Sequence, residues 1–213
     1  MPAGLRRSRP PLPRFAVAWF PAFAGIERIE AFRERHDPGA RDIAAHLSLV
    51  FPFPTAHTRL QVETHVNRVV SRWPPIPVTF RRVRMYANEF LFLMASRGGS
   101  SIAALHDRLY TRSLAPHLRR DLPYEPHITL ARHDDFAVLE VAFAEAEGAF
   151  GGEFGETIRA VTLLAVGLEL GWGPTVRGST STSGTALRIV LAVTSGCSMI
   201  SGLGVRWGPG QRI

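Results

Sequence analysis

Two short β-rich segments with a shared His-x-hydroxyl pattern constrain the fold of this chain most. They are residues 45–51 and 127–131, and their histidines, His46 and His127, lie 81 residues apart. Between them the periodicity predicts a helix, two strands and a second helix. An equivalent strand in each half of the chain favours an α+β fold. We expect two similar lobes of antiparallel sheet with outer helices, facing each other across a pseudo-twofold cleft.

The remaining elements follow from apolar spacing and from the proline and glycine residues that interrupt it. Aspartates before residue 136 are typical of a helix N-cap. Prolines at positions 74 and 75 end the helical pattern of residues 58–73. The predicted strands are 15–20, 45–51, 76–83, 89–95, 127–131 and 157–166, and the predicted helices are 26–35, 58–73, 100–109 and 134–147.

Composition divides the chain into three parts. Residues 1–13 are rich in Arg and Pro and predict a flexible basic arm, although residues 6–26 also have some features of an export signal, a less favoured interpretation. Residues 14–170 form the expected folded domain. In residues 171–213, 20 of the 43 residues are Gly, Ser or Thr and none is acidic. This tail is expected to be disordered or to be an aberrant C-terminus, with an apolar piece at 186–193 that could add an edge strand.

The net charge of +7 comes from the two ends of the chain. All 25 basic residues are Arg; four lie in the first 14 residues and four lie after residue 170. The part between them has 17 Arg against 18 acidic residues, a balance of −1. The high pI is therefore no evidence for a duplex-binding groove.

No apolar run is long enough to span a membrane and Cys197 is the single cysteine, so we expect a soluble cytoplasmic protein, taken to be a monomer.

The two motif segments carry residues suited to phosphoester chemistry. Side chains at positions i and i+2 of a strand share a face, so His46 lies beside Ser48 and His127 beside Thr129. One neutral imidazole can take a proton while the other, protonated, gives one to a leaving oxygen. The two hydroxyls can donate hydrogen bonds to phosphoryl oxygens. This set needs no metal or other cofactor.

These segments resemble the two signature strands of the 2H phosphoesterase superfamily, the 2′-5′ RNA ligase-like or RNA 2′,3′-cyclic phosphodiesterase group. The resemblance covers residues 14–170, and the first motif departs from it by having Ser48 where Thr is commoner. It implies a metal-free enzyme that opens a 2′,3′-cyclic phosphate of an RNA end or nucleotide to a 2′-phosphate. It also implies His46 as proton donor and His127 as proton acceptor.

Two further residues are candidates for substrate contacts. Arg132 could bind phosphate, although strand parity places it on the face of Ile128 and Leu130 unless the strand twists, and a plain surface arginine is the alternative. Tyr124 could stack on a base, although an aromatic residue beside a strand is more often part of the core. The other six histidines show no metal-ligand spacing, so no metal site is predicted.

Three alternatives remain open from the sequence. The same site could join 2′-5′ RNA ends. The cleft could bind RNA or a nucleotide without turnover. Finally, the two motifs could be coincidental, in which case the two histidines would lie in separate clefts.

Overall fold

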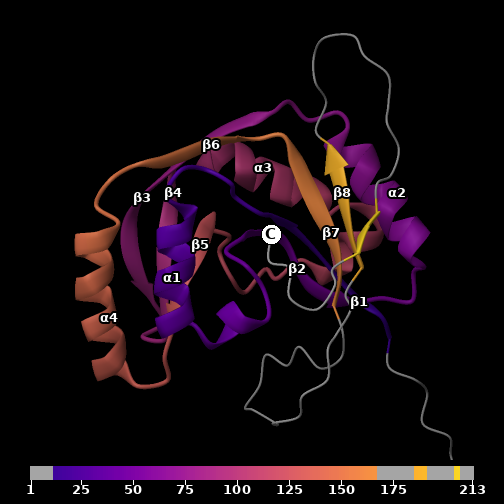
Figure 1. The fold of residues 1–213 in the computed structure, drawn as a ribbon. Coiled ribbons are helices and arrows are strands. Elements are labelled where there is room, and N and C mark those ends of the chain that lie inside the picture. Colours follow the sequence, from indigo (N-terminus) through magenta and orange to yellow (C-terminus); the bar gives the residue numbers. More distant parts are fainter. Residues whose placement is uncertain (1–11, 167–184, 191–203, 207–213) are drawn as a thin grey trace, which may run out of the picture.

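Two antiparallel sheets form the framework of the protein. The structure, a computed structural model, describes residues 12–166, 185–190 and 204–206. One sheet has the order β2-β1-β7-β8-β9 and the other has the order β5-β4-β3-β6 (Figure 1). The strands of the first sheet are β1 (Arg14–Trp19), β2 (Leu47–Pro54), β7 (Ala160–Val166), β8 (Thr185–Val190) and β9 (Gly204–Arg206). Those of the second are β3 (Ile76–Tyr86), β4 (Phe90–Arg97), β5 (His127–Arg132) and β6 (Phe154–Ile158).

The helices cover the two sheets. They are α1 (Ile26–His36), α2 (Arg59–Val70), α3 (Gly99–Leu109) and α4 (Phe136–Ala149), with short 3-10 helices η1 (Pro38–Arg41) and η2 (Arg112–His117). α1 and α4 contact the second sheet, whereas α2 and α3 contact strands of the first sheet, and α3 also reaches β3 and β4 (Figure 1). The predicted α+β fold with two antiparallel sheets and helices is therefore confirmed.

Aromatic side chains join the two sheets in a common core. Trp19 of β1 stacks on Phe80 of β3, with ring centroids 6.0 Å apart. Phe23, which follows β1, packs against both Phe80 and Phe154 of β6. All four side chains are buried. Because both sheets contribute to one closely packed core, the two sheets are held rigidly against each other.

Local sequence explains where several elements begin and turn. Thr58 and Gln61 form a capping box at the start of α2, in which each side chain accepts a backbone N–H at the other residue. The turn between β3 and β4 has positive φ at Ala87 and Asn88, and the N–H of Glu89 donates to the carbonyl oxygen of Tyr86 across it. Gly98 precedes α3 with φ +78°, and a Cβ there would clash with the carbonyl oxygen of Pro77. That close approach requires glycine at this position.

The structure corrects three predicted boundaries. β2 begins at Leu47 and continues through Pro52 to Pro54, because β2 is an edge strand and can accommodate residues that lack an N–H. The single strand predicted for 157–166 is two strands, since the chain passes from β6 in one sheet to β7 in the other at Arg159. The apolar piece expected at 186–193 as an edge strand forms β8 at Thr185–Val190, which lies between β7 and β9 and so is not an edge. The predicted arm, except residues 12 and 13, and most of the predicted tail lie outside the described residues.

Candidate active site

The two motif strands lie at the facing edges of the two sheets. β2 is the first strand of one sheet order and β5 is the first strand of the other, and the two strands contact each other. His46 immediately precedes β2, and His127 is the first residue of β5. When His127 is charged, it lowers the pKa of His46. The structure thus brings together the two motifs that the sequence predicts to share a cleft.

Both imidazole rings are held in the same way. Nδ1 of His46 donates a hydrogen bond to the carbonyl oxygen of Ala44 at 2.9 Å, and Nδ1 of His127 donates to that of Glu125 at 2.6 Å. In each case the acceptor lies two residues upstream. Because a carbonyl oxygen can only accept, the proton of each neutral ring is on Nδ1 and Nε2 carries a lone pair. Both Nε2 atoms can therefore act as bases, or as acids after protonation.

Aromatic neighbours restrict the ring orientations further. Phe92 of β4 stacks on His127 with centroids 3.7 Å apart and an interplanar angle of 19°. The ring of Phe20 lies 5.8 Å from that of His46 in a tilted arrangement. Both histidines are half-buried. A ring fixed by a hydrogen bond on one edge and an aromatic contact has little freedom to turn away from a bound substrate.

Burial lowers the pKa of both histidines. The pKa of His46 falls from its ordinary value of 6.5 to about 4, chiefly because burial disfavours the charged ring. The carbonyl of Ala44 opposes this change, and the charge of Arg33 adds to it. Burial also lowers the pKa of His127, against the opposing effect of its hydrogen bond to Glu125. At neutral pH both rings of the free protein are therefore neutral, and a bound anion would favour protonating one of them.

The hydroxyls of Ser48 and Thr129 belong to the same arrangement. Each lies two residues after its histidine and is half-exposed, whereas the alternate residues of both strands are buried: Leu47, Leu49, Ile128 and Leu130. The predicted alternation of buried residues with the motif residues is therefore confirmed. Within the described part of the chain, neither hydroxyl forms a hydrogen bond with the protein. Both are thus available to a ligand.

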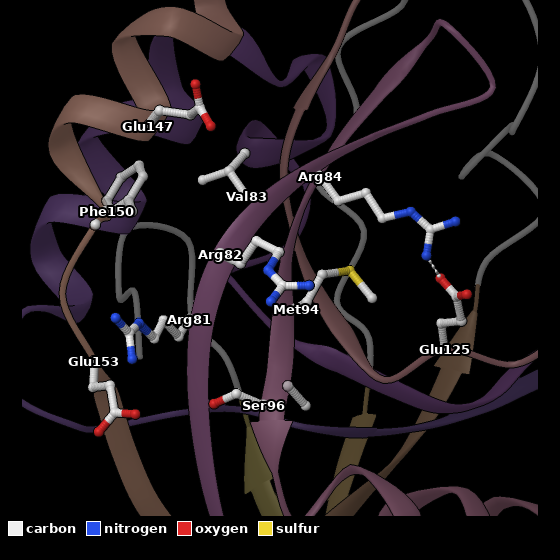
Figure 2. A pocket seen from close by; sticks show the side chains of 12 residues that line it. Arg81, Arg82, Val83, Arg84, Met94, Ser96, Glu125, Glu147, Phe150 and Glu153 are labelled. Carbon is white, nitrogen blue, oxygen red and sulfur yellow. Dashed lines mark hydrogen bonds and ion pairs between the residues drawn. The ribbon is translucent and has the colours of Figure 1, made fainter.

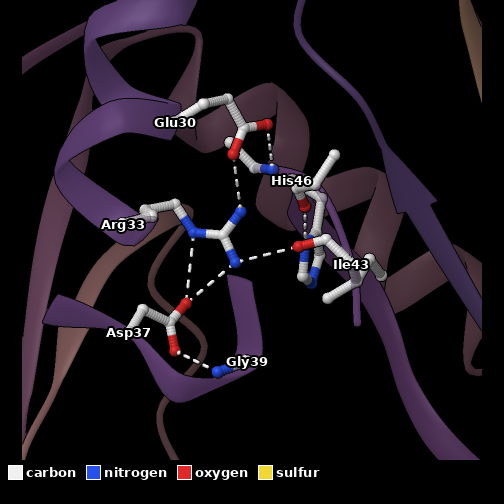
Figure 3. Close-up of polar contacts among 8 residues, drawn as sticks. Glu30, Arg33, Asp37, Gly39, Ile43 and His46 are labelled. Carbon is white, nitrogen blue, oxygen red and sulfur yellow. Dashed lines mark hydrogen bonds and ion pairs between the residues drawn. The ribbon is translucent and has the colours of Figure 1, made fainter. Parts of the chain in front are cut away.

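A buried arginine that the sequence analysis missed holds the segment before His46. Arg33 of α1 is 1% exposed and bonds to the carboxylates of Glu30 and Asp37 and to the carbonyl oxygen of Ile43, at 2.8–3.1 Å (Figure 3). Glu30 also accepts the N–H of Ala45 at 2.7 Å. The backbone on the N-terminal side of His46 is therefore tied to α1. The helical periodicity could have indicated the burial of Arg33, because this residue falls between the apolar positions of α1. A charge buried there needs partners.

Side chains also satisfy the exposed backbone edge of β2. His106 of α3 donates from Nδ1 to the carbonyl oxygen of Leu49 at 2.8 Å, and Tyr110 accepts the N–H of Phe51 at 2.9 Å. The hydroxyl of Tyr124 donates to the carbonyl oxygen of Ser48 at 2.8 Å, and its ring stacks on His106 at 3.6 Å. The predicted stacking residue Tyr124 thus makes contacts that hold the motif strand.

Arg132 occupies a different place from the other candidates. It lies at the opposite end of β5 from His127, with Nε and Nη2 each 2.7 Å from Glu89 Oε1 and the guanidinium over Phe90. The expected strand parity was wrong, because a bulge near Leu130 leaves two successive buried residues and turns Arg132 to the face of Thr129. Glu89 already balances its charge, so Arg132 is not among the groups gathered around the two histidines.

No group of three or more His, Cys, Asp or Glu side chains in the described part of the chain could hold a metal ion. None of the helices described is long and apolar enough to cross a membrane.

The chain is similar to proteins of known sequence and structure. A 22% identical relative, the "Putative phosphoesterase" of Geobacillus thermodenitrificans, aligns over 121 residues, 56% of this chain and 69% of the relative. The crystal structure of E. coli LigT without ligand matches with a TM-score of 0.53 and 20% identity, covering 87% of this chain and all of LigT. LigT complexed with 3′-AMP matches with a TM-score of 0.52 and 21% identity, covering 85% and 99%. The sequence pattern of the 2′-5′ RNA ligase superfamily matches residues 21–165, and the chain therefore belongs to that superfamily.

Proposed function

We propose that the protein is a metal-independent phosphoesterase that hydrolyses 2′,3′-cyclic phosphates of RNA ends or nucleotides to 2′-phosphates. The observation that carries the proposal is the matched pair of histidines. His46 and His127 come from facing sheet edges, and each has its Nδ1 proton held by a carbonyl two residues upstream. This leaves two Nε2 atoms for proton transfer. Membership of the superfamily and the LigT complex with 3′-AMP support a nucleotide substrate.

In this reaction His127 is the base and His46 the acid. Nε2 of His127 takes a proton from water as the water oxygen forms a bond to phosphorus. The bond between phosphorus and the 3′ oxygen breaks, and protonated His46 gives its Nε2 proton to that oxygen. Ser48 and Thr129 donate hydrogen bonds to the non-bridging oxygens, where negative charge accumulates. The products are a 2′-phosphate and a free 3′-hydroxyl, and a proton must then pass from His127 to solvent and one from solvent to His46.

The lowered pKa of His46 suits an acid that is charged only when substrate is bound. An imidazolium with a pKa near 4 transfers its proton more readily than one of ordinary pKa, but few free molecules carry it at neutral pH. The anionic phosphate supplies the opposite charge that favours protonation. Binding and activation of the acid are therefore coupled in this proposal.

The test is turnover in the presence of EDTA, with a 2′,3′-cyclic-phosphate-ended oligonucleotide and with cyclic mononucleotides. Replacing either His46 or His127 with Ala should lower kcat by about 10²–10⁴-fold, the usual contribution of one general acid or base. His57→Ala is the matched control, since His57 is an exposed histidine outside the two motifs. Activity that requires a divalent metal, or full activity in the double variant, would contradict the proposal.

Two other outcomes of the same assay have separate readouts. The superfamily description favours ligation as a second candidate, which would appear as a joined 2′-5′ product from oligonucleotides with suitable ends. A binding protein without turnover would retain the labelled cyclic nucleotide unchanged. In both cases His46→Ala and His127→Ala distinguish a role of the histidines from a role of the rest of the cleft.

A further inference from the structure

A pocket of about 820 Å³ lies against β3 and β4 of the second sheet and reaches Glu125, two residues before the motif strand β5. Its lining includes Arg82 and Arg84 of β3, Met94 and Ser96 of β4, and Glu125, whose carbonyl oxygen holds His127 (Figure 2). Met94 is paired with His127 in the β4–β5 ladder. Since directly opposite residues of antiparallel strands share a face, Met94 and His127 project to the same side. The pocket thus shares two lining residues, Met94 and Glu125, with the immediate surroundings of His127.

A β-bulge aims one arginine into this pocket. Phe80 and Val83 of β3 are both buried, with two exposed residues between them, and the β3–β4 register shifts at this point. Arg82 within the bulge has φ +78°, a left-handed conformation that costs a non-glycine residue about 1–2 kcal/mol. Figure 2 shows the consequence, because Arg82 extends toward Met94 while Arg81 extends toward Glu153 on the other side of the strand. A costly backbone conformation here selects where the guanidinium of Arg82 points.

The charges around the pocket leave Arg82 available. Arg84 forms an ion pair with Glu125, so these two charges largely balance each other. Glu147 and Glu153 line the side of the pocket toward which Arg81 extends (Figure 2). Among the residues that the structure describes, Arg82 has no ion-paired carboxylate. An exposed guanidinium with five donors and no carboxylate is suited to bind a phosphate.

The distance from the reacting site also fits a second phosphate. β3 is two strands away from β5, or about 10 Å at the usual strand spacing, and the arginine side chain can reach part of the way back. Between them lies Phe92, which is paired with Thr129 on one side and Arg84 on the other and is stacked with Tyr86. Aromatic and apolar side chains between two phosphate-binding groups are typical of surfaces that bind single-stranded nucleic acid.

We propose that Arg82 binds the phosphate on the 5′ side of the reacting nucleotide. The site then prefers an RNA end or a 5′-phosphorylated nucleotide to a nucleoside 2′,3′-cyclic phosphate that lacks the 5′-phosphate. This inference rests on the proposed function and adds a second subsite to it. The subsite consists of Arg82, Met94 and Phe92. Arg84 holds Glu125 and through it the backbone at His127, and therefore serves in positioning.

The experiment compares kcat/KM for a nucleoside 2′,3′-cyclic phosphate with and without a 5′-phosphate, and for the corresponding trinucleotide. In the unmodified protein the 5′-phosphate should raise kcat/KM at least tenfold. In Arg82→Gly the ratio between the two substrates should fall close to one. Glycine adopts φ +78° without strain, so this variant should be at least as stable as the original protein, which a thermal melt will show. Arg81→Ala is the matched control and should keep the ratio.

Salt dependence gives a second measurement of the same contact. Loss of one phosphate contact to a single strand should reduce the slope of log(kcat/KM) against log salt concentration by about 0.7 for the trinucleotide. An unchanged substrate ratio in Arg82→Gly would overturn the proposal, as would an equal loss in Arg81→Ala.

Failure of the proposed function is recognised separately. If no cyclic phosphate is hydrolysed, binding of a fluorescent trinucleotide that ends in a 2′-phosphate is measured by anisotropy. Weaker binding by Arg82→Gly than by Arg81→Ala would then support the subsite while the hydrolytic function fails. Equal binding by both variants would overturn the subsite as well.

Discussion

Replacing Arg33 with Met tests whether the buried ion pairs of α1 position His46. Arg33 is 1% exposed and makes hydrogen bonds to Glu30, Asp37 and Ile43, so methionine would fill similar space without any of these contacts. The side chain of Asp37 is 8% exposed and would be left with the N–H of Gly39 as its remaining hydrogen bond. Removing one partner of a buried pair usually costs about 3–5 kcal/mol. For a chain of this size that lowers the Tm by about 6–20 °C.

The effect on catalysis should exceed the effect of unfolding. The carbonyl of Ile43 and the N–H of Ala45 are both held by this network, and His46 follows directly. A displacement of about 1 Å at a reacting group can cost about 100-fold in rate. We therefore expect Arg33→Met to lower kcat on a cyclic nucleotide by about 10–100-fold, at a temperature where circular dichroism shows the variant folded, with a smaller change in KM.

Arg35→Met is the matched control on the same helix. Arg35 pairs with Glu145, but its side chain is 57% exposed, so loss of this pair should cost at most about 1 kcal/mol and leave kcat unchanged. The reasoning would be refuted if Arg33→Met were as stable as Arg35→Met, or if it lost stability while the kcat and pH profile of the folded fraction stayed those of the original protein. The second result would make the network purely structural.

Four further predictions follow from backbone geometry, hydrogen bonding and charge. Gly98→Ala should lower the free energy of unfolding by at least about 2 kcal/mol in urea titration, because the new Cβ would clash with a backbone carbonyl oxygen of β3 at positive φ. Gly148→Ala, in α4 with open space around it, should instead raise it by about 1 kcal/mol. Tyr110→Phe should cost about 1–3 kcal/mol in the same titration, since the N–H of Phe51 loses its acceptor; a neutral result would show that water replaces the hydroxyl. Because burial lowers the pKa of both motif histidines, that of His46 to about 4, and one ring must be protonated for turnover, kcat/KM should peak below pH 6.5 and decline toward pH 8; an optimum at or above pH 7 would contradict these pKa directions.

Much of the site could be predicted from local sequence. Alternation in β2 and β5 places His46 and Ser48, and likewise His127 and Thr129, opposite buried leucine and isoleucine residues, and the structure has this arrangement. A period of two is a property of the strand itself, so it needs no knowledge of the neighbouring strands. The helices could also be predicted, because caps and apolar spacing are local.

Interruptions of strand pairing could not be predicted in this way. The face of Arg132 depends on a bulge opposite β4, and the direction of Arg82 depends on a bulge within β3. The passage from β6 to β7 at Arg159 likewise depends on which strands each segment meets. A bulge forms where two paired strands must keep their hydrogen bonds while each also buries its apolar side chains. The sequence of one strand alone therefore does not reveal it.

The sequence by itself determined the two motifs, the faces of their strands and the class of fold. Only the tertiary structure decided that Arg33 lies buried under the first motif, that Tyr124 holds β2, and that Arg82 points toward the side of His127. The physical reason is the separation along the chain over which each interaction acts. Alternation, capping and turn preferences act between residues a few positions apart, whereas the partners of a buried charge or of an exposed strand edge are brought together only when the whole core forms.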